Sequence, residues 1–226
     1  MYIRNTFLSI LAVSAAVLSS PLRRDIPTPV DGETARQFLS ELVVAVDSND
    51  PPYSRSLFKT WDLISGNCDT RETVLKRDGT NVVTNNACAS VSGNWVSPYD
   101  GVPTTLASDL DIDHLVPLKE VKMTSNLLFI KIFTVDMTNK AWLSGARDWT
   151  PAQREAFAND LTRPQLVAIT DNLNESKGDR DVAHFLPPLA SYVCTYVRAW
   201  VTVKHFYSLT IDTAEQAALT TQLANC

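Results

Sequence analysis

Residues 111–118, with the sequence DIDHLVPL, constrain the fold of this chain more than any other segment. The apolar residues predict a strand, yet the segment carries two carboxylates, Asp111 and Asp113, that lead directly to His114. Burying a charge without a partner is costly, so a cluster of this kind normally holds a cation or transfers a proton. The fold must therefore supply partners for these side chains.

The length and composition indicate one globular domain, because 226 residues with 45% hydrophobic and 20% charged content can bury one substantial core. The N-terminus combines a basic residue, Arg4, with a short apolar run and then small residues, which is typical of a secretory signal too short to span a membrane. Arg23 and Arg24 follow as a candidate dibasic processing site, with a simple linker pair as the alternative. We expect residues 1–24 to be removed and residues 25–226 to form a secreted, soluble domain.

The four cysteines fit an exported protein. Cys68, Cys88, Cys194 and Cys226 are even in number, and none lies in a CxxC pair that would indicate zinc or redox chemistry. Three pairings are open, and proximity in the sequence favours Cys68 with Cys88 and Cys194 with Cys226. Disulfides are therefore expected in preference to a zinc site.

The formal net charge is −5, and it becomes more negative when the arginines of the leader are removed. This balance argues mildly against a polyanionic partner, so binding to nucleic acid would need a local basic patch. Candidates are residues 70–79 and the pair Lys177 and Arg180, although basic side chains on a solvated face are the commoner explanation.

Periodicity and turn signals predict an α+β fold. A helix at residues 150–161 has the clearest start, because Thr150 is placed as the cap, Pro151 occupies the first helical position and Gln153 completes a capping box. The other expected elements are helices at residues 33–46, 187–207 and 212–224, a hairpin formed by residues 72–79 and 80–85, and a buried strand at residues 165–170.

A second polar segment, residues 170–181, follows that buried strand. Its residues Asn174 and Lys177 are three apart, so on a helical turn they share one face and could both address a single phosphate. Asp113 and His114 would point to opposite sides of a regular strand. A cation could then bridge Asp113 and Asn174 while His114 faces a nucleophilic water.

These segments together resemble the HNH endonuclease superfamily, also called the ββα-metal nucleases, and particularly its secreted branch in bacteria and filamentous fungi. Residues 111–118 are similar to the first strand of that family, residues 159–170 to its second strand, and residues 174–179 to the start of its metal-binding helix. The resemblance covers nearly everything from Tyr53 onward, and it implies a single α+β domain built around a ββα-metal motif.

The resemblance implies that His114 is the general base and that Asp113 and Asn174 ligate one divalent ion. Oxygen ligands favour a hard ion such as Mg²⁺, with Mn²⁺ or Ca²⁺ also allowed. The central asparagine of the family name has two candidates, since Gln165 occupies its place and Asn159 lies just upstream. Phosphodiester hydrolysis needs a deprotonated water and a cation near the phosphate, which this set would supply.

Neighbouring polar residues have candidate supporting roles. Arg71 and Lys177 are expected to contact phosphate. Asp111 is expected to form a hydrogen bond to Lys177 or to a water bound to the ion, and the alternative is that it is a solvated residue of the strand. Asp179 and Asp181 are interpreted as loop caps. The two remaining histidines are expected to be packing or surface residues, and four tryptophans are expected to fill the core. These residues are His184, His205, Trp95, Trp142, Trp149 and Trp200.

Asn174 is also the acceptor of the N-x-[ST] sequon that it forms with Glu175 and Ser176. A glycan on Asn174 would abolish ion binding there, and we expect the sequon to be unoccupied because the site folds tightly. In the family that this chain resembles, the segment ending at residue 120 is followed almost directly by the segment that begins at Ala141, so residues 121–140 are an insertion. Our hypothesis is that the insertion is a retained intron translated in frame. A genuine insertion would instead form an apolar loop beside the site.

The sequence therefore predicts a secreted, metal-dependent nuclease that cleaves DNA, and RNA as a further option, with little sequence specificity, because it contains no separate sequence-reading module. It predicts neither a membrane anchor nor an obligate protein partner. The alternative is a catalytically inactive, secreted binding protein that retains the nuclease fold. A zinc protease is a weaker third option, since the chain lacks HExxH.

Overall fold

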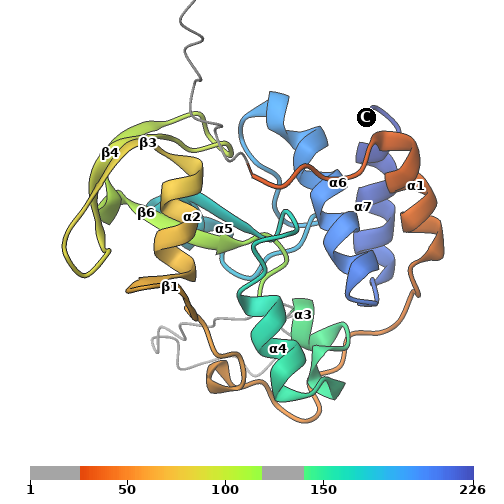
Figure 1. The fold of residues 1–226 in the computed structure, drawn as a ribbon. Helices are drawn as coiled ribbons and strands as arrows, with labels where there is room; N and C mark the ends of the chain where they lie inside the picture. The colour runs from red at the N-terminus through yellow and green to blue at the C-terminus, as the bar shows by residue number, and fades with distance from the viewer. Residues whose placement is uncertain (1–25, 119–139) are drawn as a thin grey trace, which may run out of the picture.

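The structure, a computed structural model, describes residues 26–118 and 140–226. The predicted leader and nearly all of the predicted insertion at 121–140 lie outside the described residues. The described chain forms a single mixed α/β domain, in which helices α1, α6 and α7 pack together on one side and the longer strands lie on the other (Figure 1). None of the described helices is long and apolar enough to cross a membrane.

Three helices form the helical side: α1 (Gly32–Glu41), α6 (Ala190–Phe206) and α7 (Thr213–Leu223). Asp212 caps α7 by accepting a 2.8 Å hydrogen bond from the backbone N–H of Glu215. Helix α1 ends at Glu41 and not at Val46, because Val44 adopts an extended conformation and bridges to Ile211. The run of valines there favours extended backbone over helix.

Two smaller helices lie below this bundle in Figure 1: α3 (Lys140–Leu143) and α4 (Pro151–Ala158). The predicted capping box is confirmed, with the Thr150 side chain accepting from the backbone N–H of Gln153 and the Gln153 side chain accepting from that of Thr150. Short 3-10 helices occupy Arg55–Leu57, Ala107–Asp109 and Ala146–Asp148.

The predicted hairpin around Gly79 is wrong in its first strand. The chain forms β1 (Leu63–Ser65), β2 (Cys68–Asp69), helix α2 (Thr70–Asp78), and then a sheet of β3 (Thr80–Thr84), β4 (Ser90–Val96) and β5 (Pro103–Leu106). Asp69 starts the helix by accepting a 2.9 Å hydrogen bond from the N–H of Glu72. Gly79 is required by close packing, since a Cβ there would lie 2.3 Å from the Trp95 indole nitrogen.

Both predicted disulfides are confirmed. Cys68 pairs with Cys88 and ties the start of α2 to the β3–β4 connection, and Cys194 pairs with Cys226 and ties α6 to the C-terminus. Within the described part of the chain no cysteine is free.

The two strands that carry the predicted site pair with each other in an antiparallel sheet. Strand β6 (Leu110–His114) runs in regular register against β7 (Leu166–Thr170), from Leu110 opposite Thr170 to His114 opposite Leu166. Helix α5 (Asp171–Lys177) follows β7 directly and contacts both strands. The strand predicted at residues 165–170 is therefore confirmed to within one residue.

This sheet separates two hydrophobic cores. On one face Ile112 and Ala168 belong to a cluster with residues of α2 and β4, and on the other Val167 and Ile169 join the larger core with the helical side. Alternation along β6 places Asp111 and Asp113 on the α5 side of the strand and Ile112 and His114 on the α2 side. The regular register thus holds the carboxylates and the imidazole on opposite sides of one strand.

The predicted packing roles of the remaining aromatic residues are confirmed. Trp95, Trp142 and Trp200 are buried core residues, and Trp149 packs against the larger core. His205 stacks on Phe38 with centroids 3.7 Å apart.

Candidate functional site

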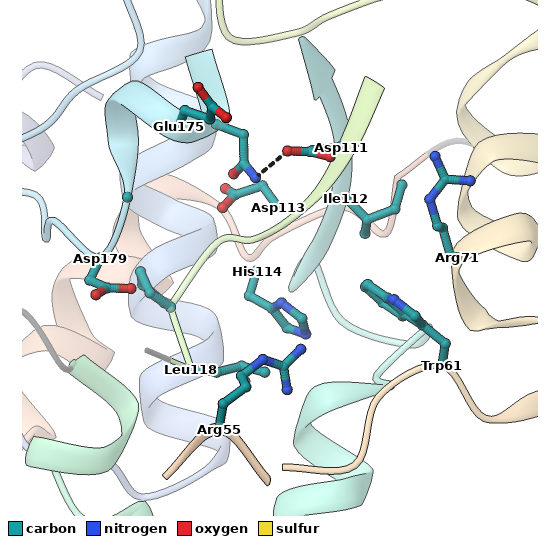
Figure 2. A pocket seen from close by; sticks show the side chains of 13 residues that line it. Arg55, Trp61, Arg71, Asp111, Ile112, Asp113, His114, Leu118, Glu175 and Asp179 are labelled. Atoms are coloured by element: carbon teal, nitrogen blue, oxygen red, sulfur yellow. Dashed lines mark hydrogen bonds between the residues drawn. The ribbon is translucent and has the colours of Figure 1, made fainter. Parts of the chain in front are cut away.

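A cavity of about 540 Å³ lies along the edge of β6 and reaches α5, α2 and the segment that precedes β1. Figure 2 shows the side chains that line it. His114 and Asn174 both line this cavity, so the fold brings together two side chains that are 60 residues apart in the sequence. Asp111, Asp113 and Arg71 line the same cavity, as the sequence predicted for a single site.

The imidazole of His114 is oriented by one backbone carbonyl. Its Nε2 lies 2.9 Å from the carbonyl oxygen of Ala158 at the end of α4. Since a carbonyl can only accept, Nε2 carries the proton and Nδ1 keeps its lone pair. Burial is the main cause that lowers the pKa of His114 to about 3; the Ala158 carbonyl opposes this shift, and the charges of Arg55 and Lys177 add to it. The imidazole is therefore neutral at physiological pH.

The carboxylate of Asp113 is held in a buried cluster. Lys177 donates to its Oδ1 at 2.8 Å, and the hydroxyl of Tyr99 donates to its Oδ2 at 2.7 Å. Burial raises the pKa of Asp113, and the charge of Lys177 opposes that rise. Lys177 is 0% exposed and also donates to the backbone carbonyl of His114 at 3.1 Å. Its ammonium therefore joins α5 to β6, and the expectation of a phosphate contact from Lys177 does not fit this placement.

Asp111 and Asn174 face each other across the gap between β6 and α5. The Asn174 amide nitrogen donates to Asp111 Oδ2 at 3.0 Å, as the dashed line in Figure 2 shows. This leaves the amide oxygen of Asn174 and the second carboxylate oxygen of Asp111 at the cavity. Carboxylate and amide oxygens are ligands that hard divalent cations prefer, so the residues present fit the ion that the sequence predicted.

Two arginines supply positive charge to the cavity. Arg71 is anchored by Glu72 at 2.7 Å and by the carbonyl oxygens of Ala107 and Leu110, both at 3.3 Å. Arg55 was not predicted from the sequence, and its guanidinium is held by the carbonyl oxygen of Phe58 at 2.8 Å. Guanidinium groups fixed in this way are suited to binding phosphate oxygens.

Trp61 is a further cavity residue that was not predicted from the sequence. Its indole is stacked on the His114 imidazole, with centroids 5.7 Å apart and an interplanar angle of 17°. Trp61 has a φ of 53°, which is uncommon for a residue other than glycine. Arg55 begins a short 3-10 helix and Trp61 lies in the irregular chain after it, and neither belongs to a recognisable motif, so only the tertiary structure reveals their position.

The two candidates for the central asparagine position both support the site from outside the cavity lining. The Gln165 side chain accepts from the N–H of Val116 at 3.1 Å and donates to its carbonyl at 2.9 Å, which ties the end of β6 to the start of β7. Asn159 accepts from the N–H of Asp62 at 3.0 Å and thereby fixes the residue that follows Trp61. Their proposed functional equivalence to that asparagine stays a prediction.

Asp181 acts as a loop cap, as predicted, because its Oδ1 accepts from the N–H of Ala183 at 3.0 Å. Asp179 is 7% exposed and belongs to the cavity lining. The occupancy of the sequon at Asn174 stays a prediction, and its amide nitrogen is the atom that donates to Asp111.

Comparison with known proteins adds independent information. The model of the family described as GmrSD restriction endonucleases, C-terminal domain, matches residues 68–222, which include β6, β7 and α5. An "Uncharacterized secreted protein" of Arthroderma benhamiae is 46% identical over 224 residues, covering 98% of this chain and 98% of that protein. No solved structure matches. The predicted secretion is confirmed by this relative and agrees with the two disulfides.

Proposed function

The chain belongs to the family of the GmrSD restriction endonuclease C-terminal domain, and from this premise we propose that it is a secreted, metal-dependent endonuclease of the HNH type. The observation that carries the proposal is the cavity in which a neutral histidine, oxygen donors and two anchored arginines meet. Its substrate is nucleic acid, and the reaction is hydrolysis of phosphodiester bonds.

The order of elements around the cavity supports the HNH type. Two antiparallel strands, β6 and β7, are followed directly by helix α5, and the predicted base and ion ligands come from β6 and α5. This is the order of strand, strand and helix that the resemblance to the ββα-metal nucleases implies. The likeness to that superfamily thus rests on topology as well as on the quoted motifs.

His114 is suited to act as the general base. The carbonyl of Ala158 fixes the proton on Nε2, so Nδ1 is the nitrogen that accepts a proton from the attacking water. The lowered pKa keeps this nitrogen unprotonated at neutral pH. Because its pKa is low, the imidazole that has taken a proton from the attacking water readily passes it on to solvent or to the leaving 3′-oxygen, which needs a proton as the bond breaks.

A hard divalent ion, Mg²⁺ in preference to Mn²⁺ or Ca²⁺, would neutralise the charge that develops on the phosphate. The sequence assigns Asp113 and Asn174 as its ligands, and Asp111 lines the same side of the cavity. Arg55 and Arg71 would hold the neighbouring phosphate oxygens and thereby position the scissile bond.

The proposed substrate is DNA, with RNA as a further option, and the proposed cleavage is largely independent of sequence. The contacts available at the cavity are charged groups that suit the phosphate backbone, which carries no sequence information directly. The net charge is −5, so attraction to the phosphate backbone depends on the cavity arginines, and each phosphate contact that they form makes binding sensitive to salt.

The test is nicking of supercoiled plasmid by the purified protein with Mg²⁺, with EDTA, and after His114→Ala. Cleavage that requires Mg²⁺ and falls by about 100-fold or more in His114→Ala supports the proposal. A protein that binds DNA but leaves the plasmid intact under every condition is the inactive binding protein, and this result would refute the enzyme. A parallel cleavage assay with RNA shows whether the enzyme distinguishes ribose from deoxyribose in its substrate.

A further inference from the structure

We propose that the disulfide between Cys68 and Cys88 is a thiol-exchange site, which a small extracellular thiol compound opens. The second disulfide, between Cys194 and Cys226, stays closed under the same conditions. Structural disulfides of secreted proteins usually resist reduction, so the first bond would serve for regulation as well as for linkage. The two bonds differ in the charge that lies beside their sulfur atoms.

The ammonium of Lys76 lies against both sulfur atoms of the first disulfide. Its Nζ is 2.8 Å from Cys88 Sγ and 3.1 Å from Cys68 Sγ. A positive charge at this distance stabilises a thiolate, which is the form in which a sulfur leaves when another thiol attacks the bond. Lys76 therefore speeds the opening of this bond and favours its reduced form.

The second disulfide has the opposite surroundings. Cys194 Sγ lies 3.8 Å from the carbonyl oxygen of Asn225, and Cys226 Sγ lies 3.2 Å from that of Gln222. A carbonyl oxygen carries partial negative charge, so it repels a thiolate at the same position. The protein thus contains an internal reference against which the effect of Lys76 can be measured.

The two sulfur atoms of the proposed site differ in accessibility, which sets the direction of the exchange. Cys68 is partly exposed, whereas Cys88 is 8% exposed. The attacking thiolate forms a mixed disulfide with Cys68 and displaces the thiolate of Cys88, the sulfur nearer to Lys76. A second thiol molecule then attacks the sulfur of the first, which frees Cys68 and releases the small compound as its own disulfide. The protein bond gains two electrons, and the protons of both thiols end on the two cysteines.

The backbone at Cys88 also favours opening. Its φ is 69°, in the left-handed region that residues other than glycine rarely occupy. Cys88 lies in the connection between β3 and β4, which the disulfide ties to β2. A backbone conformation of this kind persists where the surrounding structure enforces it. Opening the bond allows this connection to relax.

The opened bond would affect the cavity through Glu72. One oxygen of this buried carboxylate accepts from Arg71 at 2.7 Å, and the other accepts at 2.6 Å from the N–H of Ser90, which lies two residues after Cys88. A relaxed connection would withdraw the Ser90 contact and loosen the carboxylate that anchors Arg71. This consequence rests on the proposed function, because Arg71 is the proposed phosphate contact, whereas the thiol exchange does not depend on it.

The experiment follows both disulfides of the folded full-length protein in reduced glutathione. Free thiols are blocked with iodoacetamide at intervals, and peptide mass spectrometry measures the opened fraction of each bond and identifies the cysteine that carries glutathione. We expect the first disulfide to open at least about tenfold faster than the second, with the adduct on Cys68. Equal rates, an adduct on Cys88, or two bonds that both stay closed would overturn the proposal.

The charge is tested with Lys76→Met, and Lys76→Arg is the matched control that keeps a cation. Lys76 is exposed, so both variants should fold, which melting temperatures of the oxidised proteins verify. We expect Lys76→Met to slow opening of the first disulfide by about tenfold and to leave the second unchanged, while Lys76→Arg retains the wild-type rate. The same ratios are expected with cysteamine, a cationic thiol. Wild-type rates in Lys76→Met, or a loss seen with anionic glutathione alone, would overturn the role of Lys76 in stabilising the leaving sulfur.

The link to the cavity is measured in the His114→Ala variant, as affinity for DNA before and after the first disulfide is opened and blocked. We expect the affinity to fall and the slope of log affinity against log salt to decrease by about 1, as for the loss of one phosphate contact. Unchanged affinity would overturn the link to Arg71. A protein that binds no DNA in either state would refute the proposed function and this link, and the mass measurements would still decide the exchange site.

Discussion

The indole of Trp61 lies nearly parallel to the imidazole of His114, with ring centroids 5.7 Å apart. The two residues come from segments that are distant in the sequence, yet they form one wall of the cavity (Figure 2). Trp61 covers a ring whose burial lowers its pKa to about 3. We therefore expect the protonation state of the proposed base to depend on packing by Trp61, a residue outside the strand that carries His114.

The first prediction concerns the pH dependence of the reaction. The neutral form of His114 is the proposed base, so nicking should persist well below the ordinary pKa of 6.5 and be lost only as pH falls toward 3. Initial rates measured from neutral pH down to about pH 4 test this, with circular dichroism to confirm that the protein stays folded. A rate that falls with an apparent pKa near 6.5 would contradict the burial of the ring.

The second prediction follows from the stacking. Trp61→Ala should admit water to His114, raise its pKa toward 6.5 and move the acid limb of the rate profile to higher pH. Trp61→Phe is the matched control, because it retains an aromatic cover over the imidazole. Equal profiles for the two variants would show that Trp61 does not control the pKa.

The same pKa shift has a consequence for stability. The unfolded chain binds a proton at His114 below pH 6.5 that the folded protein excludes until pH approaches 3. The contribution of His114 to the free energy of unfolding is therefore fully present above pH 6.5 and is lost progressively as pH falls from 6.5 to 3. Urea unfolding of the wild type and of His114→Gln at several pH values isolates this contribution, which should be absent in the variant.

Short-range chemistry made much of the fold predictable. The Thr150 capping box and the cysteine pairs depend on residues near one another in the sequence, and the structure confirms both. The motif residues Asp111, Asp113, His114 and Asn174 were likewise predicted to share a site, and all line one cavity.

Features that depend on distant partners were predicted poorly. The burial of Lys177 depends on Asp113, which is 64 residues away, and a lysine in a polar segment gives no local sign of it. The start of α2 depends on Asp69 as its cap, and this signal outweighs the alternating pattern of residues 72–79, which predicts a strand. Arg55 enters the site only through the path of an irregular segment.

The buried pair of Lys177 and Asp113 leads to a further prediction, on stability. Lys177→Met alone should lower the free energy of unfolding by about 3–5 kcal/mol, because it leaves the Asp113 carboxylate buried without its cation. Adding Asp113→Leu should recover much of that loss, since the double variant buries no unpaired charge. Chemical denaturation of the four proteins gives the coupling energy, and strictly additive effects would contradict a direct pair.

Another prediction concerns the disulfide at the start of α2. Replacing Cys68 and Cys88 by serine should lower the free energy of unfolding by about 2–5 kcal/mol, since the bond closes a chain segment that otherwise gains freedom in the unfolded state. Arg71 follows Cys68 closely, so affinity for DNA should fall as well. The double serine variant of Cys194 and Cys226, which is remote from the cavity, is the control that should lose stability and retain affinity.

The last prediction distinguishes arginines that contact phosphate from arginines that only support the structure. DNA binding is measured by fluorescence anisotropy in the His114→Ala background, where cleavage cannot interfere. Arg55→Gln and Arg71→Gln should each weaken binding to every DNA sequence and reduce the slope of log affinity against log salt by about 1, because each removes one phosphate contact.

The control for this experiment is Arg36→Gln, since Arg36 lies on α1 and donates to the carbonyl of Leu223, away from the cavity. It should leave both the affinity and the salt slope unchanged. If Arg55→Gln or Arg71→Gln weakens binding by the same factor at every salt concentration, that arginine shapes the cavity without touching phosphate. The salt slope therefore distinguishes a direct contact from a packing effect, which a single affinity would not.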